Sequence, residues 1–186
     1  SKGFNISDME AAGVIKRGNK VYYDNFRNRV MTPIIDVRGN VIAFGGRVLD
    51  DSKPKYINTG DTIVYKKTNE LFALNLAKDS GSESLILCEG YMDVIAMHQA
   101  GFTNAVAGCG PALTNEQVRL ISRYASEVIL AYDADEAGQK ALQKAISLFN
   151  QTDVKVRIPA LRGGKDPDEI IKNVGRDKFA AMLEDS

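Results

Sequence analysis

The chain has 186 residues, of which 44% are hydrophobic and 26% charged, a composition typical of a globular protein rather than a disordered one. Its apolar runs are too short to span a membrane. Two cysteines without a CxxC pattern and a single histidine argue against a disulfide framework or a zinc site, so we expect a cytoplasmic protein.

The net charge of zero conceals an asymmetry between the two halves of the chain. Residues 1–80 carry 13 Lys and Arg against 9 Asp and Glu (+4), whereas residues 81–186 carry 11 against 15 (−4). A basic half beside an acidic half favours a phosphate-rich ligand on one side and cations on the other. An ordinary imbalance between two surfaces explains the same counts equally well.

In the first part of the chain, short strand-like runs dominate. The stretch SDMEAAGVI is predicted to be a short helix capped by Ser7 and closed near Gly13. The runs RVMTPIIDV and VIAFGGRVL, separated by the turn RGN, predict a β-hairpin or a meander, and TNELFALNLAK is expected to be a helix. A Gly/Ser-rich joint at 77–84 then indicates a boundary, so we divide the chain into residues 1–82 and 83–186.

After this joint, strand and helix patterns alternate. The expected strands are SLILCEG, NAVAGCG, EVILAYD and DVKVRIPAL. The helices that follow them are MDVIAMHQAG, TNEQVRLISRYA, EAGQKALQKAISLFNQ and DPDEIIKNVG. Repeated β–α units predict an α/β fold, with a parallel sheet flanked by helices. Ligands of such sheets bind outside the carboxyl ends of the strands.

Acidic residues follow three of these strands. Glu89 ends the first, Asp133 and Asp135 follow the third, and Asp166 and Asp168 follow the fourth. A helix cap requires one acceptor and contributes about 1 kcal/mol. Two carboxylates ~4 Å apart repel by about 4 kcal/mol at an effective dielectric constant near 20, so convergence of all five at one edge far exceeds the benefit of capping.

Capping nevertheless explains part of the pattern. Asp133-x-x-Glu136 and Asp166-x-x-Glu169 both have the form of a capping box, the second with proline at the first helical position. Thr114-x-x-Gln117 is the same device without surplus charge, and we interpret it as a cap alone. Convergence of all five acids at one sheet edge favours divalent cations bound among them. Oxygen ligands without histidine or cysteine indicate Mg²⁺ or Mn²⁺, and hence phosphoryl or nucleotidyl transfer.

The acidic stretches CEGYMDVIAMHQAG, AYDADEAGQKA and GGKDPDEII resemble the three motifs of the Toprim domain in order and in placement. The flanking stretches FRNRVMTPIIDVRGNVIAFGGRVL, PKYINTGDT and YKKTNELFAL resemble the basic N-terminal subdomain of the bacterial DnaG-type replicative primases. The resemblance runs from about Gly3 onwards. It implies a Toprim-type parallel sheet preceded by a smaller, mixed α/β basic subdomain.

The resemblance also implies an activity, namely the synthesis of a short RNA primer on single-stranded DNA from ribonucleoside triphosphates. It assigns Glu89, Asp133 and Asp135 to the metals nearest the chemistry, and Asp166 and Asp168 to a metal carried by the nucleotide. Two roles stay open. Asp93, one turn past Glu89, is either an outer ligand or an ordinary first-turn acid, and Glu89 is either a ligand or a general base.

In the basic half, Arg47 in FGGR, Lys55 in PKY and Lys67 in YKK match positions that the family places along a groove for template and nucleotide phosphates. Tyr56 and Asn58 lie beside them and could stack on or bond to nucleic acid. Ordinary solvated charge is the alternative for these basic residues, and without the resemblance it is favoured for Lys66 and Lys67.

The resemblance further implies a monomeric piece of the polymerase core, without the family's zinc module and without the domain that binds the replicative helicase. Expected partners are single-stranded DNA, ribonucleoside triphosphates and the RNA–DNA hybrid product, with no membrane. Two alternatives stay open. A Toprim nuclease or topoisomerase fragment would lack the FGGR, PKY and YKK series. A receiver-type signalling domain requires a phosphoacceptor Asp and a late-strand Lys, which Lys165 supplies only loosely.

Overall fold

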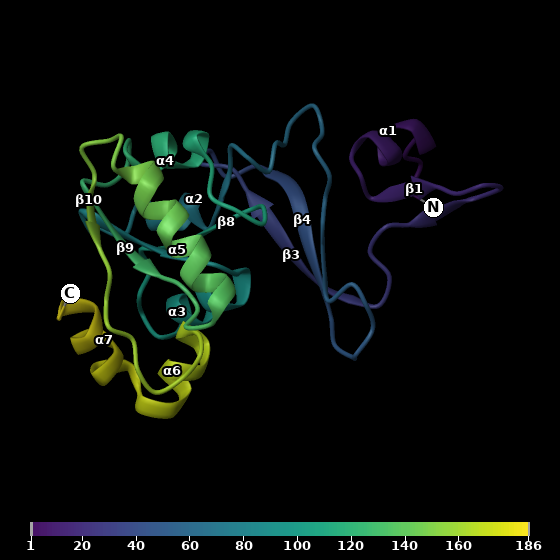
Figure 1. Ribbon diagram of the computed structural model, residues 1–186. Helices are drawn as coiled ribbons and strands as arrows, with labels where there is room; N and C mark the ends of the chain where they lie inside the picture. Colours follow the sequence, from purple (N-terminus) through teal and green to yellow (C-terminus); the bar gives the residue numbers. More distant parts are fainter. Residues whose placement is uncertain (1, 186) are drawn as a thin grey trace. The chain divides into compact units, whose positions relative to one another are not determined.

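The structure is a computed structural model that describes residues 2–185, and it divides into two compact units, Ser1–Lys67 and Thr68–Ser186 (Figure 1). The divide lies earlier in the chain than the expected boundary at 82/83. Strand β6 (Leu71–Phe72) is the reason, because it pairs with β8 (Ala105–Gly108) and joins residues 68–82 to the second unit.

The first unit contains a short helix and two antiparallel sheets. Helix α1 spans Ile6–Ala11, strands β1 (Ile15–Arg17) and β2 (Tyr22–Asp24) pair with each other, and the larger sheet has the order β3-β4-β5. The last three strands span Arg29–Ile35, Val41–Val48 and Tyr56–Asn58. The predicted hairpin is confirmed as β3–β4, and β5 extends it to three strands.

The predicted cap of the first helix is wrong. The N-cap residue of α1 is Asn5, whose side chain makes no capping hydrogen bond, and Ser7 lies inside the first turn. The expected end near Gly13 is confirmed, since Gly13 adopts φ +71°, a left-handed conformation that favours glycine.

The predicted helix at TNELFALNLAK is largely wrong. Leu71 and Phe72 form β6 instead, and only Leu74–Ala77 are helical, as α2. Ala73 between them has φ +65°, which interrupts any continuous helix. Tertiary pairing with β8 therefore overrides the local helix preference.

The second unit contains a five-stranded sheet in the order β10-β9-β7-β8-β6. Strands β7 (Ser84–Cys88), β8, β9 (Glu127–Ala131) and β10 (Lys155–Arg157) are mutually parallel, which confirms the predicted parallel sheet, whereas β6 is antiparallel. From β7 the chain crosses to β8, which lies on one side of β7, and then to β9, which lies on the other side of β7. The topological switch point therefore lies between β7 and β9.

Besides α2, the described residues of this unit form five more helices: α3 (Tyr91–Gln99), α4 (Asn115–Ile121), α5 (Glu136–Phe149), α6 (Pro167–Val174) and α7 (Arg176–Glu184). α5 lies over one face of the sheet, where it packs against α4, whereas α3 packs against α6 (Figure 1). Right-handed crossovers account for this division, because β7–α3–β8 and β8–α4–β9 run in opposite directions across the sheet. The Thr114 capping box at α4 is confirmed.

The strands of this sheet are buried on both faces, with Leu85, Ile86, Val106, Val128 and Leu130 all at most 2% exposed. Such continuous apolar runs are typical of central parallel strands. Within residues 2–185, no helix is long and apolar enough to cross a lipid bilayer.

Candidate active site

The switch point of the sheet brings the first and third acidic motifs together. Cys88, the last residue of β7, lies in register with Ala131, the last residue of β9. Glu89 follows directly, and Asp133 follows after Tyr132. The Asp133 amide donates a hydrogen bond of 3.0 Å to Oε1 of Glu89, so the two motifs are joined at the strand ends.

Among the acidic residues of the site, Asp133 has the carboxyl group with the largest pKa shift. Burial, followed by the negative charges of Glu89, Asp93, Asp166 and Asp135, raises the pKa of its carboxyl group from 3.8 to about 7. Its Oδ1 atom is buried and has no hydrogen-bond partner among residues 2–185. An orphaned buried carboxylate oxygen is costly, and a cation would satisfy it.

Asp135 has a second role, because it is the N-cap of α5. Its Oδ1 accepts a hydrogen bond of 2.8 Å from the Gly138 amide, so the capping box predicted at Asp133 and Glu136 is wrong. Gly138, which sequence reasoning missed, makes this turn possible. A Cβ atom there would lie 2.7 Å from Oε1 of Glu89 and would also collide with the carbonyl of Asp133. The only sequence signal was a glycine in the first turn of a helix.

Asp93 links the first acidic motif to the last. Burial raises the pKa of its carboxyl group from 3.8 to about 6, and the charges of Asp166 and Asp168 act in the same direction. Backbone hydrogen bonds from Gly90 and Asp168 oppose this shift. Asp93 on α3 therefore lies at the start of α6, beside the DPD motif.

The DPD motif itself begins a helix. Asp166 is the N-cap of α6 and accepts a 2.8 Å hydrogen bond from the Glu169 amide, with Pro167 at the first helical position, so the predicted cap is confirmed. The Glu169 carboxylate bonds to the amide of Lys165, one residue earlier than in a standard capping box. The Lys165 carbonyl accepts from the Ala134 amide at 2.9 Å, which ties this loop to the segment between Asp133 and Asp135.

Asp135 and Asp168 each make another contact within the protein, and the acidic side chains do not converge on one metal position. Asp168 forms an ion pair of 2.6 Å with Lys172. Among residues 2–185, no group of three or more Asp, Glu, His or Cys side chains is arranged to hold one metal ion. Mg²⁺ commonly uses only one or two carboxylates, together with water and substrate phosphates. The unpartnered Asp133 oxygen and an all-oxygen donor set therefore fit such a cation.

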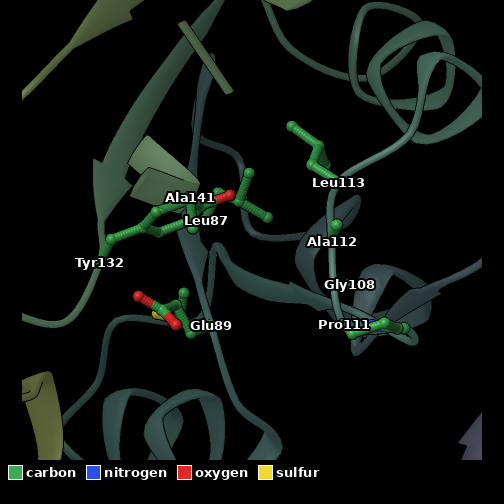
Figure 2. A pocket seen from close by; sticks show the side chains of 10 residues that line it. Leu87, Glu89, Gly108, Pro111, Ala112, Leu113, Tyr132 and Ala141 are labelled. Carbon is green, nitrogen blue, oxygen red and sulfur yellow. The ribbon is translucent and has the colours of Figure 1, made fainter. Parts of the chain in front are cut away.

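A pocket of about 200 Å³ adjoins Glu89 on one side (Figure 2). Leu87, Tyr132 and Ala141 line one part of it, and residues 110–113 of the loop after β8 form the opposite wall. Burial, helped by the charges of Glu89 and Cys88, raises the pKa of the Tyr132 phenol, so this group stays protonated. Polar and apolar surface contribute about equally to the pocket. Its side-chain polar groups are the Glu89 carboxylate, the Tyr132 phenol and the Cys88 thiol, and no lysine or arginine among the described residues lines it.

In the first unit, three of the five predicted substrate-binding residues lie together. Arg47 on β4 is in register with Tyr56 on β5, and its guanidinium lies 5.7 Å from the centroid of that ring. The ammonium of Lys55 lies 5.9 Å from the same centroid. Asn58 is exposed at the end of β5, and the Lys67 amide bonds to Asp61 in a separate loop.

Sequence reasoning missed Arg29, which organises this group. Its guanidinium donates hydrogen bonds to the carbonyls of Gly46, Pro54 and Lys55, at 3.1, 2.7 and 3.2 Å. These bonds fix the segment that carries Lys55 against β4. No spacing in the sequence distinguishes Arg29 from its neighbour Arg27.

Comparison with known proteins matches both units. A Toprim-like family model matches residues 86–171, and the model of the DNA primase catalytic core, N-terminal domain, matches residues 1–78. A DNA primase of Clostridium acetobutylicum is 45% identical over 187 residues, which cover all of this chain and 31% of that protein. A DNA primase of Haemophilus influenzae is 43% identical over 173 residues, which cover 90% of this chain and 29% of that protein.

Solved structures agree with these matches. A DNA primase domain from Pseudomonas aeruginosa superimposes with a TM-score of 0.91 at 41% identity, covering 98% of this chain and 60% of that one. A DnaG primase catalytic domain bound to single-stranded DNA gives 0.89 at 38%, covering 96% and 58%.

The fold and its acidic switch point define a Toprim-type domain, a class whose members depend on metal ions in general. The chain belongs, more specifically, to the bacterial DnaG primase family, and it spans about a third of the length of the curated relatives that it matches.

Proposed function

We propose that this chain supplies the nucleotidyl-transfer centre of a primase, which extends an RNA primer on single-stranded DNA in the bacterial cytoplasm. The observation that carries the proposal is the meeting of Glu89 and Asp133 at the switch point, where a buried Asp133 oxygen has no partner among residues 2–185. The similarity to a primase catalytic domain whose solved structure contains single-stranded DNA supports the choice of template.

In the reaction, the 3′-hydroxyl of a ribonucleotide attacks the α-phosphorus of a nucleoside triphosphate. A new P–O bond forms, the bond to the β-phosphate oxygen breaks, and pyrophosphate leaves. Bound Mg²⁺ or Mn²⁺ would supply Lewis acidity and offset the negative charge of the phosphates. Asp133, Asp135 and Glu89 would hold the ions nearest the chemistry, Asp166 and Asp168 the ion that accompanies the triphosphate, and Asp93 would act from outside.

Glu89 could instead take the proton of the attacking hydroxyl. Burial raises the pKa of its carboxyl group, and the charge of Asp135 acts in the same direction, although the bond from the Asp133 amide opposes both. That amide occupies Oε1, and Oε2 has no hydrogen bond among the described residues. One oxygen is therefore positioned by the fold, and the other is available for a cation or a proton.

The basic group of the first unit would bind phosphates. Arg47 offers a planar fork for two parallel hydrogen bonds, Lys55 and Lys67 offer mobile charges, and the exposed ring of Tyr56 offers a stacking surface beside Asn58. Template, nucleotide and the RNA–DNA hybrid product all present such phosphates. We further propose that the protein acts as a monomer, with the replicative helicase bound through another part of the full-length protein.

The test replaces Asp135 with asparagine in the full-length protein. Asparagine is as good an N-cap as aspartate, so the cap of α5 is retained while the charge is lost. We expect primer synthesis on single-stranded DNA to fall at least a hundredfold, with a melting temperature equal to or above that of the wild type. Asp135→Ala serves as the control for capping and should lower the stability by about 1 kcal/mol.

Two results would reject the proposal. Primer synthesis retained by Asp135→Asn would remove the carboxylate from the chemistry. Relaxation or cleavage of duplex DNA by the wild type, without RNA synthesis, would favour the nuclease or topoisomerase alternative.

A further inference from the structure

The pocket beside Glu89 lies on a defined side of the acidic site. Its lining includes Ala141 of α5 and residues 110–113, the loop that leads into α4. Asp93 on α3 and Asp168 on α6 belong to the other pair of packed helices. The right-handed crossovers put these two helix pairs on opposite faces of the sheet, so Glu89 separates the pocket from the DPD side.

The size and lining of the pocket restrict its occupant. A volume of about 200 Å³ is below the range of about 300–1,000 Å³ for sites that enclose drug-sized ligands, so a single ring or sugar fits, but an entire nucleoside triphosphate does not. Leu87, Pro111 and Leu113 present apolar surface that suits the face of a ring. Within residues 2–185, the lining has the Glu89 carboxylate and no lysine or arginine, so it does not suit a phosphate.

Tyr132 supplies a polar group that no atom of residues 2–185 uses. Figure 2 shows its ring extending from the end of β9 into the pocket, above the carboxylate of Glu89. Its hydroxyl has no hydrogen-bond partner among residues 2–185. A phenol can donate to and accept from a ribose hydroxyl or a ring nitrogen.

We propose that this pocket binds the sugar of the nucleotide that provides the attacking 3′-hydroxyl, with Tyr132 as its polar anchor. This inference rests on the proposed function and adds the location of one reactant to it. The phosphate-bearing reactant belongs to the DPD side, where a cation can accompany the triphosphate. The pocket side of Glu89 is therefore left for the primer end, or for the first nucleotide when a primer begins.

The test fills the pocket from α5 with Ala141→Leu in the full-length protein. The substrates are the ribodinucleotide adenylyl-adenosine as primer, ATP and an oligo-dT template. We expect the KM for the dinucleotide to rise at least tenfold, whereas the KM for ATP stays within twofold. The equilibrium affinity for the dinucleotide, measured without ATP, should fall by the same factor, because the added methyl groups occupy its site.

Two further variants keep the test decisive. Tyr132→Phe keeps the ring and removes one hydrogen bond, so the affinity for the dinucleotide should fall about two- to tenfold. Gln143→Leu adds a leucine to an exposed position of the same helix and should change neither KM. Binding of Mn²⁺, followed by electron paramagnetic resonance, should be the same in all three variants and the wild type.

The outcomes separate this inference from the proposed function. An unchanged affinity for the dinucleotide in both Ala141→Leu and Tyr132→Phe would overturn the pocket assignment, even if Asp135→Asn abolishes synthesis. A selective rise in the KM for ATP would also overturn it, because the pocket would then belong to the incoming nucleotide. If Ala141→Leu fails to fold, the result for Tyr132→Phe decides.

Discussion

Acidic residues at the two edges of the sheet in the second unit have opposite electrostatic environments. At the amino edge, Glu127 of β9 forms ion pairs with Lys155 at 3.0 Å and with Arg157 at 3.3 Å. At the carboxyl edge of the same strand, Asp133 lies among other acids, and no ion pair to it or to Glu89 occurs within residues 2–185. The amino edge thus neutralises its charge within the protein, whereas the acids Glu89 and Asp133 at the carboxyl edge have no counter-charge among the described residues.

The pKa shifts express the same difference. Burial acts to raise the pKa of Glu127, but hydrogen bonds from Lys155 and Arg157 outweigh it, and the pKa is lowered. The pKa of Asp133 is raised to about 7, because burial is reinforced by neighbouring negative charge. Folding therefore favours the ionised form of Glu127 and disfavours the ionised form of Asp133.

The largest effect is expected from the same isosteric substitution made at each edge. Glu89→Gln should lower primer synthesis at least a hundredfold and leave the stability unchanged or raised, because an acid is removed from a repulsive group. Glu127→Gln should leave the activity unchanged and lower the stability by about 0.5–1 kcal/mol, because two partly exposed ion pairs are lost.

Activity assays and urea denaturation of both variants make this comparison. A loss of stability in Glu89→Gln that matches its loss of activity would show that Glu89 is structural. The contrast between the two edges would then disappear.

Gly138→Ala tests how closely α5 approaches the carboxyl edge. Alanine is a better helix former than glycine by about 1 kcal/mol, so a stabilised helix is the naive expectation. Because the added Cβ would collide with the Asp133 carbonyl and with Glu89, we expect a net destabilisation of about 1–3 kcal/mol and reduced activity. Urea denaturation measures this change, and Gln143→Ala on the exposed face of α5 is the control, within about 0.5 kcal/mol of the wild type.

The stability of the metal-free protein should depend on pH with opposite signs at the two edges. Asp133 binds its proton more tightly in the folded state, so its contribution is lost as the pH rises from about 4 towards 7. Glu127 behaves in the opposite way, and its contribution is lost as the pH falls through its lowered pKa. After allowance for solvent screening, the Asp133 effect is on the order of 1 kcal/mol.

Denaturation at pH 4.5, 6 and 7.5 in the presence of a chelator measures this dependence. Asp133→Asn should flatten the decline between pH 4.5 and 7.5, and added Mg²⁺ should reverse it in the wild type alone. A decline that persists unchanged in Asp133→Asn would assign it to other groups.

Much of this arrangement follows from sequence patterns that act locally. The alternation of apolar strands and amphipathic helices predicts the parallel sheet, and an acid directly after a buried strand must lie at its carboxyl edge. Glu89 and Asp133 could be located in this way. The caps at Thr114 and Asp166 were predictable for the same reason, because each depends on residues three apart.

The features that could not be predicted depend on contacts between distant segments. β6 forms because Leu71 and Phe72 pair with β8, and no local pattern encodes that partner. Asp135 is the cap in place of Asp133 because α5 begins at Glu136, where Gly138 in its first turn lies close to Glu89. Arg29 binds carbonyls that are 17 to 26 residues away in the sequence.

The smallest effects are expected in the first unit, where the question is whether the basic group binds ligand phosphates or is an ordinary exposed surface. Lys55→Ala and Lys67→Ala should each weaken binding of single-stranded DNA several-fold and reduce the slope of log affinity against log salt by about 0.7. Their melting temperatures should stay within about a degree of the wild type, because both side chains are exposed.

Arg47→Lys sharpens this test, because it keeps the charge and removes the planar fork. We expect a larger loss of nucleotide affinity than the retained charge would suggest, together with a salt slope close to that of the wild type. Arg29→Lys provides a contrast, since its three carbonyl bonds are structural, and it should lower the stability of the first unit.

The measurement is a salt titration of the affinity for DNA and for nucleoside triphosphate in the full-length protein, alongside thermal denaturation. Unchanged affinities and slopes in Arg47→Lys, Lys55→Ala and Lys67→Ala would return these residues to an ordinary exposed surface. The acidic carboxyl edge would then be the functional part of this chain, without a contribution from the basic half.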